Sequence, residues 1–116
     1  MNILVFSDTH LYLPFDGKKF DFLKKIISDA DQVIINGDFF DEYMISFDDF
    51  INSPWNKLFP LLKSKKTVYI FGNHDMPLLS DTRIYLFCEW AGFRLKIKSG
   101  DLLLHIEHGH LLSGNL

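Results

Sequence analysis

The chain has 116 residues, of which 47% are hydrophobic, and its formal net charge at pH 7 is −3. This length fits one domain with an apolar core, and the apolar content excludes an intrinsically disordered protein. The lack of a long basic run argues against a protein that binds nucleic acid through a broad cationic face. The single cysteine, Cys88, excludes an intrachain disulfide framework and a metal cluster held by several thiolates.

The N-terminal segment reads MNILVFSDTH, and it lacks the basic flank, the long apolar stretch and the small-residue cleavage site of a secretory signal peptide. No apolar run in the sequence approaches the roughly 18 residues that are needed to span a membrane. We therefore expect a cytoplasmic protein without a transmembrane segment.

The hydrophobic pattern predicts alternating strands and helices along the first part of the chain. Residues 2–6 form an apolar run that is typical of a buried strand, and residues 19–30 carry the apolar stripe of an amphipathic helix. A second strand is expected at 32–35. Two short helices are expected between residues 47 and 62, because Pro54 and Pro60 interrupt the helical pattern.

The second part of the chain begins with a predicted buried strand at 67–70. A helix is expected next, with Asp81 as its N-cap and Gly92 at its C-terminal end. Residues 93–98 alternate in polarity and should pair with 102–110 across the turn SGD. The order β-α-β-α-β-α-β-β predicts an α/β fold, a mixed and largely parallel sheet with helices on both faces.

Polar side chains follow the predicted strands at the points where the strands end. Because the carboxyl ends of parallel strands meet at one edge of a sheet, and ligands bind there in open α/β sheets, we expect these side chains to converge. In chain order they are Asp8, His10, Asp38, Asn73, His74, Asp75, His108 and His110.

The predicted ligand set contains carboxylates and imidazoles but no sulfur, which favours Mn, Fe, Zn or Ni over a structural zinc ion. Such a cluster can hold two divalent metal ions roughly 3.5–4 Å apart. Asp38 is the candidate bridging ligand, because the preceding Gly37 lets the backbone come close. Two metal ions lower the pKa of a shared water and polarise an ester oxygen, so the sequence predicts hydrolysis of a phosphoester or phosphoanhydride by metal-activated water.

The segments SDTH, NGDFFD, GNHD and HGH resemble, in this order, the motifs of the calcineurin-like metallophosphoesterase family. Each segment alone would fit an ordinary turn, but the four together cover nearly the whole chain. The resemblance implies a metallophosphoesterase fold and a metal-dependent phosphoesterase that acts on a phosphorylated substrate. It implies one metal ion at Asp8, His10 and Asp38, and a second at Asp38, Asn73 and His108.

The resemblance also implies catalytic roles for two residues of GNHD. His74 would contact the phosphate and assist the leaving group, and Asp75 would orient the imidazole of His74. The loops HLYLP and GDFFDEY further resemble those of UDP-2,3-diacylglucosamine diphosphatases.

The family's final G-H-x-H element, which by resemblance supplies one imidazole to each metal ion, is absent. We therefore expect residues 1–116 to be the N-terminal portion of a metallophosphoesterase domain. A truncated product, a natural short form and a site completed by a second chain remain open, and His110 or water could fill the vacant position.

The same gap keeps a second function open, a non-catalytic or single-metal-binding domain of this fold that acts in protein interaction. A sheet without the strands that normally follow would expose an edge, which predicts a homodimer through that edge.

Overall fold

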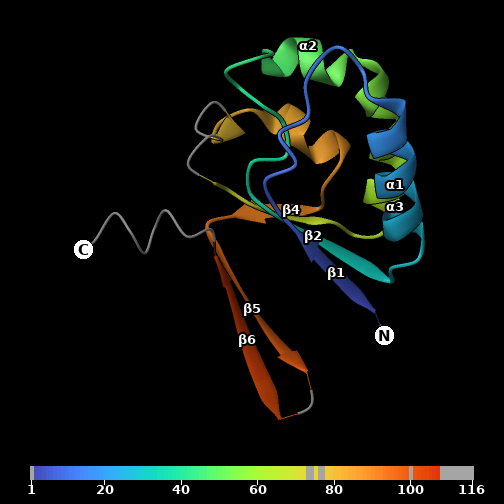
Figure 1. Ribbon diagram of the computed structural model, residues 1–116. Coiled ribbons are helices and arrows are strands. Elements are labelled where there is room, and N and C mark those ends of the chain that lie inside the picture. Colours follow the sequence, from blue (N-terminus) through green and yellow to red (C-terminus); the bar gives the residue numbers. More distant parts are fainter. Residues whose placement is uncertain (1, 73–74, 76–77, 100, 108–116) are drawn as a thin grey trace.

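The structure is a computed structural model that describes residues 2–72, 75, 78–99 and 101–107 (Figure 1). Its strands are β1 (Ile3–Phe6), β2 (Gln32–Asn36), β3 (Val68–Ile70), β4 (Trp90–Gly92), β5 (Arg94–Ser99) and β6 (Leu102–Glu107). Its α-helices are α1 (Gly17–Ser28), α2 (Phe47–Ile51) and α3 (Phe59–Ser64), with 3₁₀ helices η1 (Pro54–Leu58) and η3 (Thr82–Leu86).

The first four strands form one parallel sheet in the order β1-β2-β3-β4. Their carboxyl ends therefore lie on the same edge, and the segments that follow β1, β2 and β3 leave the sheet there. Strands β5 and β6 form a separate antiparallel hairpin, with Arg94 opposite Glu107. These pairings confirm the predicted mixed, largely parallel α/β fold.

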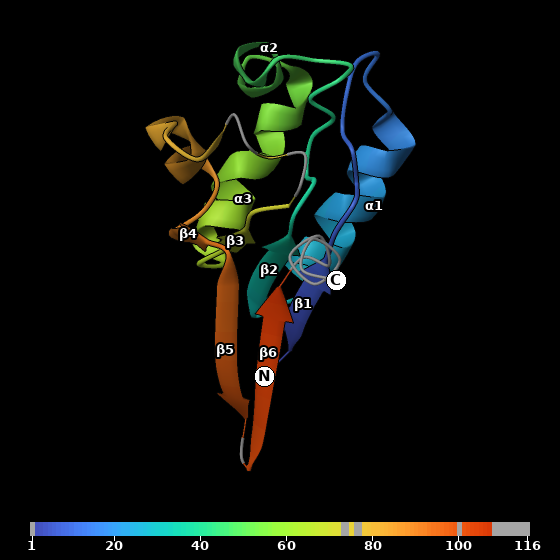
Figure 2. The ribbon, with the colours of Figure 1, turned by 90° about the vertical axis from the view of Figure 1, so that its left-hand side faces the viewer.

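The helices pack on one face of the parallel sheet. Val33 and Ile35 of β2 and Tyr69 of β3 point into the core that the helices cover, whereas Ile34 points to the opposite face. That opposite face is contacted by apolar residues of the hairpin, Leu95, Ile97 and Ile106. Figure 2 shows the hairpin extending away from the helices. Within the described ranges, the expectation of helices on both faces is wrong, because the apolar side of the hairpin takes the place of a second helical layer.

The predicted helix that follows Asp81 is also wrong. The Asp81 side chain does cap a helix by accepting a hydrogen bond from the N–H of Arg83, but η3 ends at Leu86. The chain then enters β4, which pairs with β3. Gly92 lies in this strand, where an added Cβ would come within 2.4 Å of the Trp90 ring.

The remaining helices follow the sequence closely. Asp16 caps α1 by accepting a hydrogen bond from the N–H of Lys19, and the break predicted at Pro54 separates α2 from η1. Pro60 lies in the first turn of α3 and does not interrupt it. Across the described part of the chain, none of the helices combines the length and the apolar character that crossing a membrane requires.

Aromatic rings fill the core between the helices and the sheet. The ring centroid of Phe87 lies 5.3 Å from that of Phe39 and 5.0 Å from that of Phe59. Phe39, which is fully buried, follows the predicted metal ligand Asp38 in the chain. Packing of Phe39 therefore fixes the segment that carries Asp38 to the core.

Candidate metal centre

The loops that follow β1 and β2 run side by side and continue the pairing of the two strands. The N–H of His10 donates to the carbonyl oxygen of Asp38 at 3.0 Å, and the N–H of Leu11 donates to that of Phe39 at 2.9 Å. The N–H of Asp41 returns a hydrogen bond to the carbonyl oxygen of Leu11 at 2.8 Å. These contacts hold the first two motifs at the carboxyl edge of the sheet.

Asp8, His10 and Asp38 are brought together by this pairing. One ligand atom from each residue lies within 4.8 Å of the others, and Nε2 of His10 is 3.5 Å from Oδ1 of Asp8. Donor atoms at these separations can share one ion at about 2.0–2.2 Å each. Two carboxylates and an imidazole are also the donor set of a divalent cation, so the residues present fit a metal ion.

All three residues of this group have backbone conformations in the left-handed region. The φ angles are 56° at Asp8, 45° at His10 and 55° at Asp38, and Gly37 has a φ of 81°. A non-glycine residue in this region costs on the order of 1–2 kcal/mol. The fold holds the three side chains in place against this cost, which is typical of functional sites.

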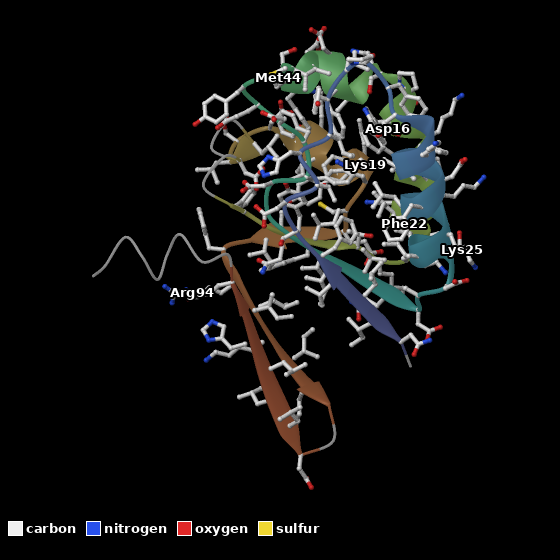
Figure 3. All side chains as sticks on the ribbon, viewed as in Figure 1. Asp16, Lys19, Phe22, Lys25, Met44 and Arg94 are labelled. Atoms are coloured by element: carbon white, nitrogen blue, oxygen red, sulfur yellow. The ribbon has the colours of Figure 1, made fainter. Side chains whose placement is uncertain are left out.

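Thr9 anchors the turn between Asp8 and His10. Its hydroxyl donates to the carbonyl oxygen of Phe39 at 2.8 Å, and its own carbonyl oxygen accepts a hydrogen bond from Nζ of Lys19 at 2.5 Å. Lys19 belongs to α1 (Figure 3), so the helix and the loop after β2 both restrain the turn.

The carboxylate of Asp75 holds the other side of the centre together. It is fully buried and accepts three hydrogen bonds, from the N–H of Gly72 at 2.6 Å, the N–H of Asp38 at 2.9 Å and the hydroxyl of Tyr69 at 2.9 Å. The Tyr69 oxygen in turn accepts a hydrogen bond from the N–H of Phe39 at 3.2 Å. The segment after β3 is thereby tied to the segment that carries Asp38.

Burial determines the protonation states of Asp75 and Tyr69. Desolvation raises the pKa of the Asp75 carboxyl, and the N–H groups of Asp38 and Gly72 oppose the shift. Burial, followed by the nearby Asp75 charge, raises the pKa of Tyr69 well above its usual value. The Tyr69 hydroxyl therefore remains protonated and able to donate to Asp75.

The structure describes four of the eight predicted site residues. It brings Asp8, His10 and Asp38 together, and it links Asp75 to the backbone of Asp38. The other four lie outside the described residues: Asn73, His74, His108 and His110. Their predicted roles stay predictions.

The end of the hairpin lies close to the end of β2. Nδ2 of Asn36 donates to the carbonyl oxygen of Glu107 at 3.2 Å. Asn36 is the last residue of β2, and Glu107 immediately precedes His108 in the chain. The fold thus directs β6 towards the edge where the Asp8–His10–Asp38 group lies.

Several supporting residues were missed by sequence reasoning. Tyr69 carried a usable signal, because a tyrosine in a run expected to be a buried strand needs a partner for its hydroxyl. Gly72 opens the segment GNHD, and its role is steric: a Cβ there would lie 2.6 Å from Oδ1 of Asp38. Thr9 and Lys19 carried no sequence signal for their contact.

A parallel sheet with a carboxylate–imidazole group at its carboxyl edge defines an α/β protein with a candidate metal centre. The family model described as calcineurin-like phosphoesterase matches residues 1–114. The chain therefore belongs to the calcineurin-like phosphoesterase family. No curated protein sequence gives a significant match to this chain.

Solved structures share the fold at low sequence identity. Yfce, a phosphoesterase from E. coli, is 19% identical with a TM-score of 0.58, over 96% of this chain and 59% of that protein. The protein AQ665 from Aquifex aeolicus, described as of unknown function, has the same identity and TM-score, over 90% of this chain and 58% of that protein. The nuclease MPE from Pseudomonas putida is 22% identical with a TM-score of 0.53, over 83% of this chain and 50% of that protein. The chain spans less than two thirds of each of these proteins.

Replacing Gly72 with alanine should weaken metal binding. The new Cβ would lie 2.6 Å from Oδ1 of Asp38, so the carboxylate must move away from its place beside Asp8 and His10. We expect the affinity for Mn²⁺, measured by titration calorimetry, to fall roughly 10-fold or more. Gly17→Ala is the matched control, because a Cβ at Gly17 meets nothing within 4 Å. Equal affinities of the two variants would contradict the close approach of Gly72 to Asp38.

Replacing Asp75 with asparagine should destabilise the protein. One carboxylate oxygen becomes an NH₂ group that cannot accept a hydrogen bond, so at least one buried donor among Gly72, Asp38 and Tyr69 loses its partner. We expect the free energy of unfolding in urea to fall by about 1–3 kcal/mol. The control is Asp101→Asn, at an exposed position in the hairpin turn. A stability equal to that of the control would show that the Asp75 contacts contribute nothing.

Proposed function

We propose that the chain is a metal-dependent phosphoesterase that uses two divalent metal ions to cleave a phosphoester or phosphoanhydride. The observation that carries the proposal is the Asp8–His10–Asp38 group, at the carboxyl edge of the sheet in a member of the calcineurin-like family. These three residues would hold the first ion. When bound, the two ions lower the pKa of a water and polarise the phosphoryl oxygens.

The second ion is proposed to bind to Asp38, Asn73 and His108. Two described contacts support this ligand set. Asp75 accepts a hydrogen bond from the N–H of Asp38, so the GNHD segment is tied to Asp38. Asn36 donates to the carbonyl oxygen of Glu107, the residue before His108.

Two residues of GNHD are proposed to act on the substrate. His74 contacts the phosphoryl group and gives a proton to the leaving oxygen. Asp75 positions His74, its neighbour in the chain. The support for this role is the fixed place of Asp75, whose carboxylate is held by Gly72, Asp38 and Tyr69.

Three finer predictions rest on the sequence alone. They are the resemblance to UDP-2,3-diacylglucosamine diphosphatases, manganese as the native ion and a cytoplasmic location.

The second candidate function is a single-metal-binding or non-catalytic domain in protein interaction. It is favoured by the metal-ligand group in the described part of the chain, which has three members and suits one ion.

Metal content and hydrolysis, measured on the same sample, separate the two functions. We expect close to two ions per chain after addition of Mn²⁺, and turnover of an aryl phosphodiester. Asp38→Ala should abolish turnover and reduce the bound metal, because Asp38 is proposed to serve both ions. Asp49→Ala, at an exposed position in α2, should change neither. One ion per chain without turnover would contradict the phosphoesterase and favour the single-metal domain.

We also propose that the chain forms a homodimer through an exposed sheet edge. β1 is an edge strand of the parallel sheet, and Val5 in this strand is 46% exposed. An apolar edge of this kind invites pairing with a second strand. Light scattering should give the mass of a dimer for the native chain and of a monomer for Val5→Lys. A native chain that stays monomeric at high concentration would contradict the dimer.

A further inference from the structure

A cavity of about 730 Å³ lies next to the candidate metal centre, between the loop after His10 and the beginning of α1. His10 belongs to the Asp8–His10–Asp38 group and also lines this cavity. One molecule can therefore place a phosphoryl group at the metal centre and a second part in the cavity. The volume is within the range of small-molecule sites, roughly 300–1,000 Å³.

Aromatic side chains line the cavity, and Phe15 among them packs against other rings. The ring of Phe15 lies 4.6 Å from the ring of Trp55 and 5.4 Å from that of Phe20, measured between centroids. Trp55 is buried and donates from Nε1 to the carbonyl oxygen of Tyr12 at 2.8 Å. Tyr12 and Phe15 nevertheless remain 41% and 36% exposed. The ring of Phe15 is held from behind and still accessible, and Tyr12 lines the same cavity, so both rings are suited to stacking on a planar group.

The charges around the cavity are balanced. Lys18 and Lys19 are offset by Asp16 and Asp21, which line the same cavity. Asp16 already caps α1 with its carboxylate, so the positive end of the helix dipole is occupied. The ammonium group of Lys19 donates to the carbonyl oxygen of Thr9. The balanced charges do not favour binding of a second phosphate in the cavity. The charged residues around the cavity also do not favour binding of a long acyl chain.

We propose that this cavity binds the uncharged aromatic ring of the substrate, a nucleobase, which makes the substrate a nucleotide-like phosphoester. The placement of the phosphoryl group rests on the proposed phosphoesterase function. Binding of the ring does not rest on that function, because the cavity is lined by side chains of the loop after His10, of α1 and of η1. Lys18 and Asp21 can offer a donor and an acceptor to the polar edge of the base.

The test is a titration of the metal-free chain with adenosine and with uridine, followed by NMR. The chain has two tryptophans, so the indole resonance of Trp55 reports on the cavity and that of Trp90 serves as an internal control. We expect saturable shifts at Trp55 and at the amides of residues 10–21, with little change at Trp90. D-ribose, which lacks a base, should produce no shift.

Two tyrosine variants complete the test. Tyr12→Ala should weaken nucleoside binding by at least about fivefold, the loss that is typical of one stacking ring. Tyr85→Ala, on η3 and 46% exposed, should leave it unchanged, because Tyr85 does not line this cavity.

Three results would overturn the inference: no saturable shift, equal shifts with D-ribose, or equal effects of the two variants. Failure of the phosphoesterase proposal would look different, because nucleosides would still bind while the metal-loaded chain turned over no phosphodiester. Turnover without nucleoside binding would overturn the nucleobase subsite alone.

Discussion

The buried carboxylate of Asp75 is the constraint on which the candidate centre depends. Its two oxygens accept hydrogen bonds from two N–H groups and one hydroxyl, on segments that follow β2 and β3 or lie within β3. A buried carboxylate is stable only when such donors surround it, so the three donors and the acceptor fix one another. The close approach of Gly72 to Asp38 is a direct result, because the two residues share the same acceptor oxygen.

The parallel sheet and the left-handed turns make complementary contributions to the centre. The sheet brings the ends of β1 and β2 to one edge. The positive φ angles at Asp8, His10 and Asp38 bend the backbone beyond the strands, and the hydrogen bonds between the loops keep the two segments side by side. The backbone strain is thus concentrated at the residues whose side chains must meet.

Much of the fold and part of the centre could be predicted from the sequence. The apolar runs before Asp8 and Asp38 located β1 and β2, and the rule for carboxyl ends predicted that these ligands converge. Ile84, Phe87 and Cys88 are buried at a helical spacing, which predicted a longer helix after Asp81. In the structure Ile84 lies in η3, whereas Phe87 and Cys88 lie in the segment between η3 and β4, so a helical spacing of buried residues does not require a continuous helix. The contacts of Lys19 with Thr9 and of Asp75 with the Asp38 N–H join side chains to backbone across 10 and 37 positions, and no periodic pattern records such contacts.

The separate hairpin ties the end of β2 to a late part of the chain. The Asp8–His10–Asp38 group is assembled from two neighbouring loops, whereas the contact of Asn36 with Glu107 spans 71 positions and requires the hairpin to dock on the opposite face of the sheet. Closing a loop of this length costs chain entropy, which the docking of the hairpin must compensate. The packing of Leu95 and Ile97 under the sheet supplies this compensation, so a substitution far from the Asp8–His10–Asp38 group can loosen the contact at the end of β2.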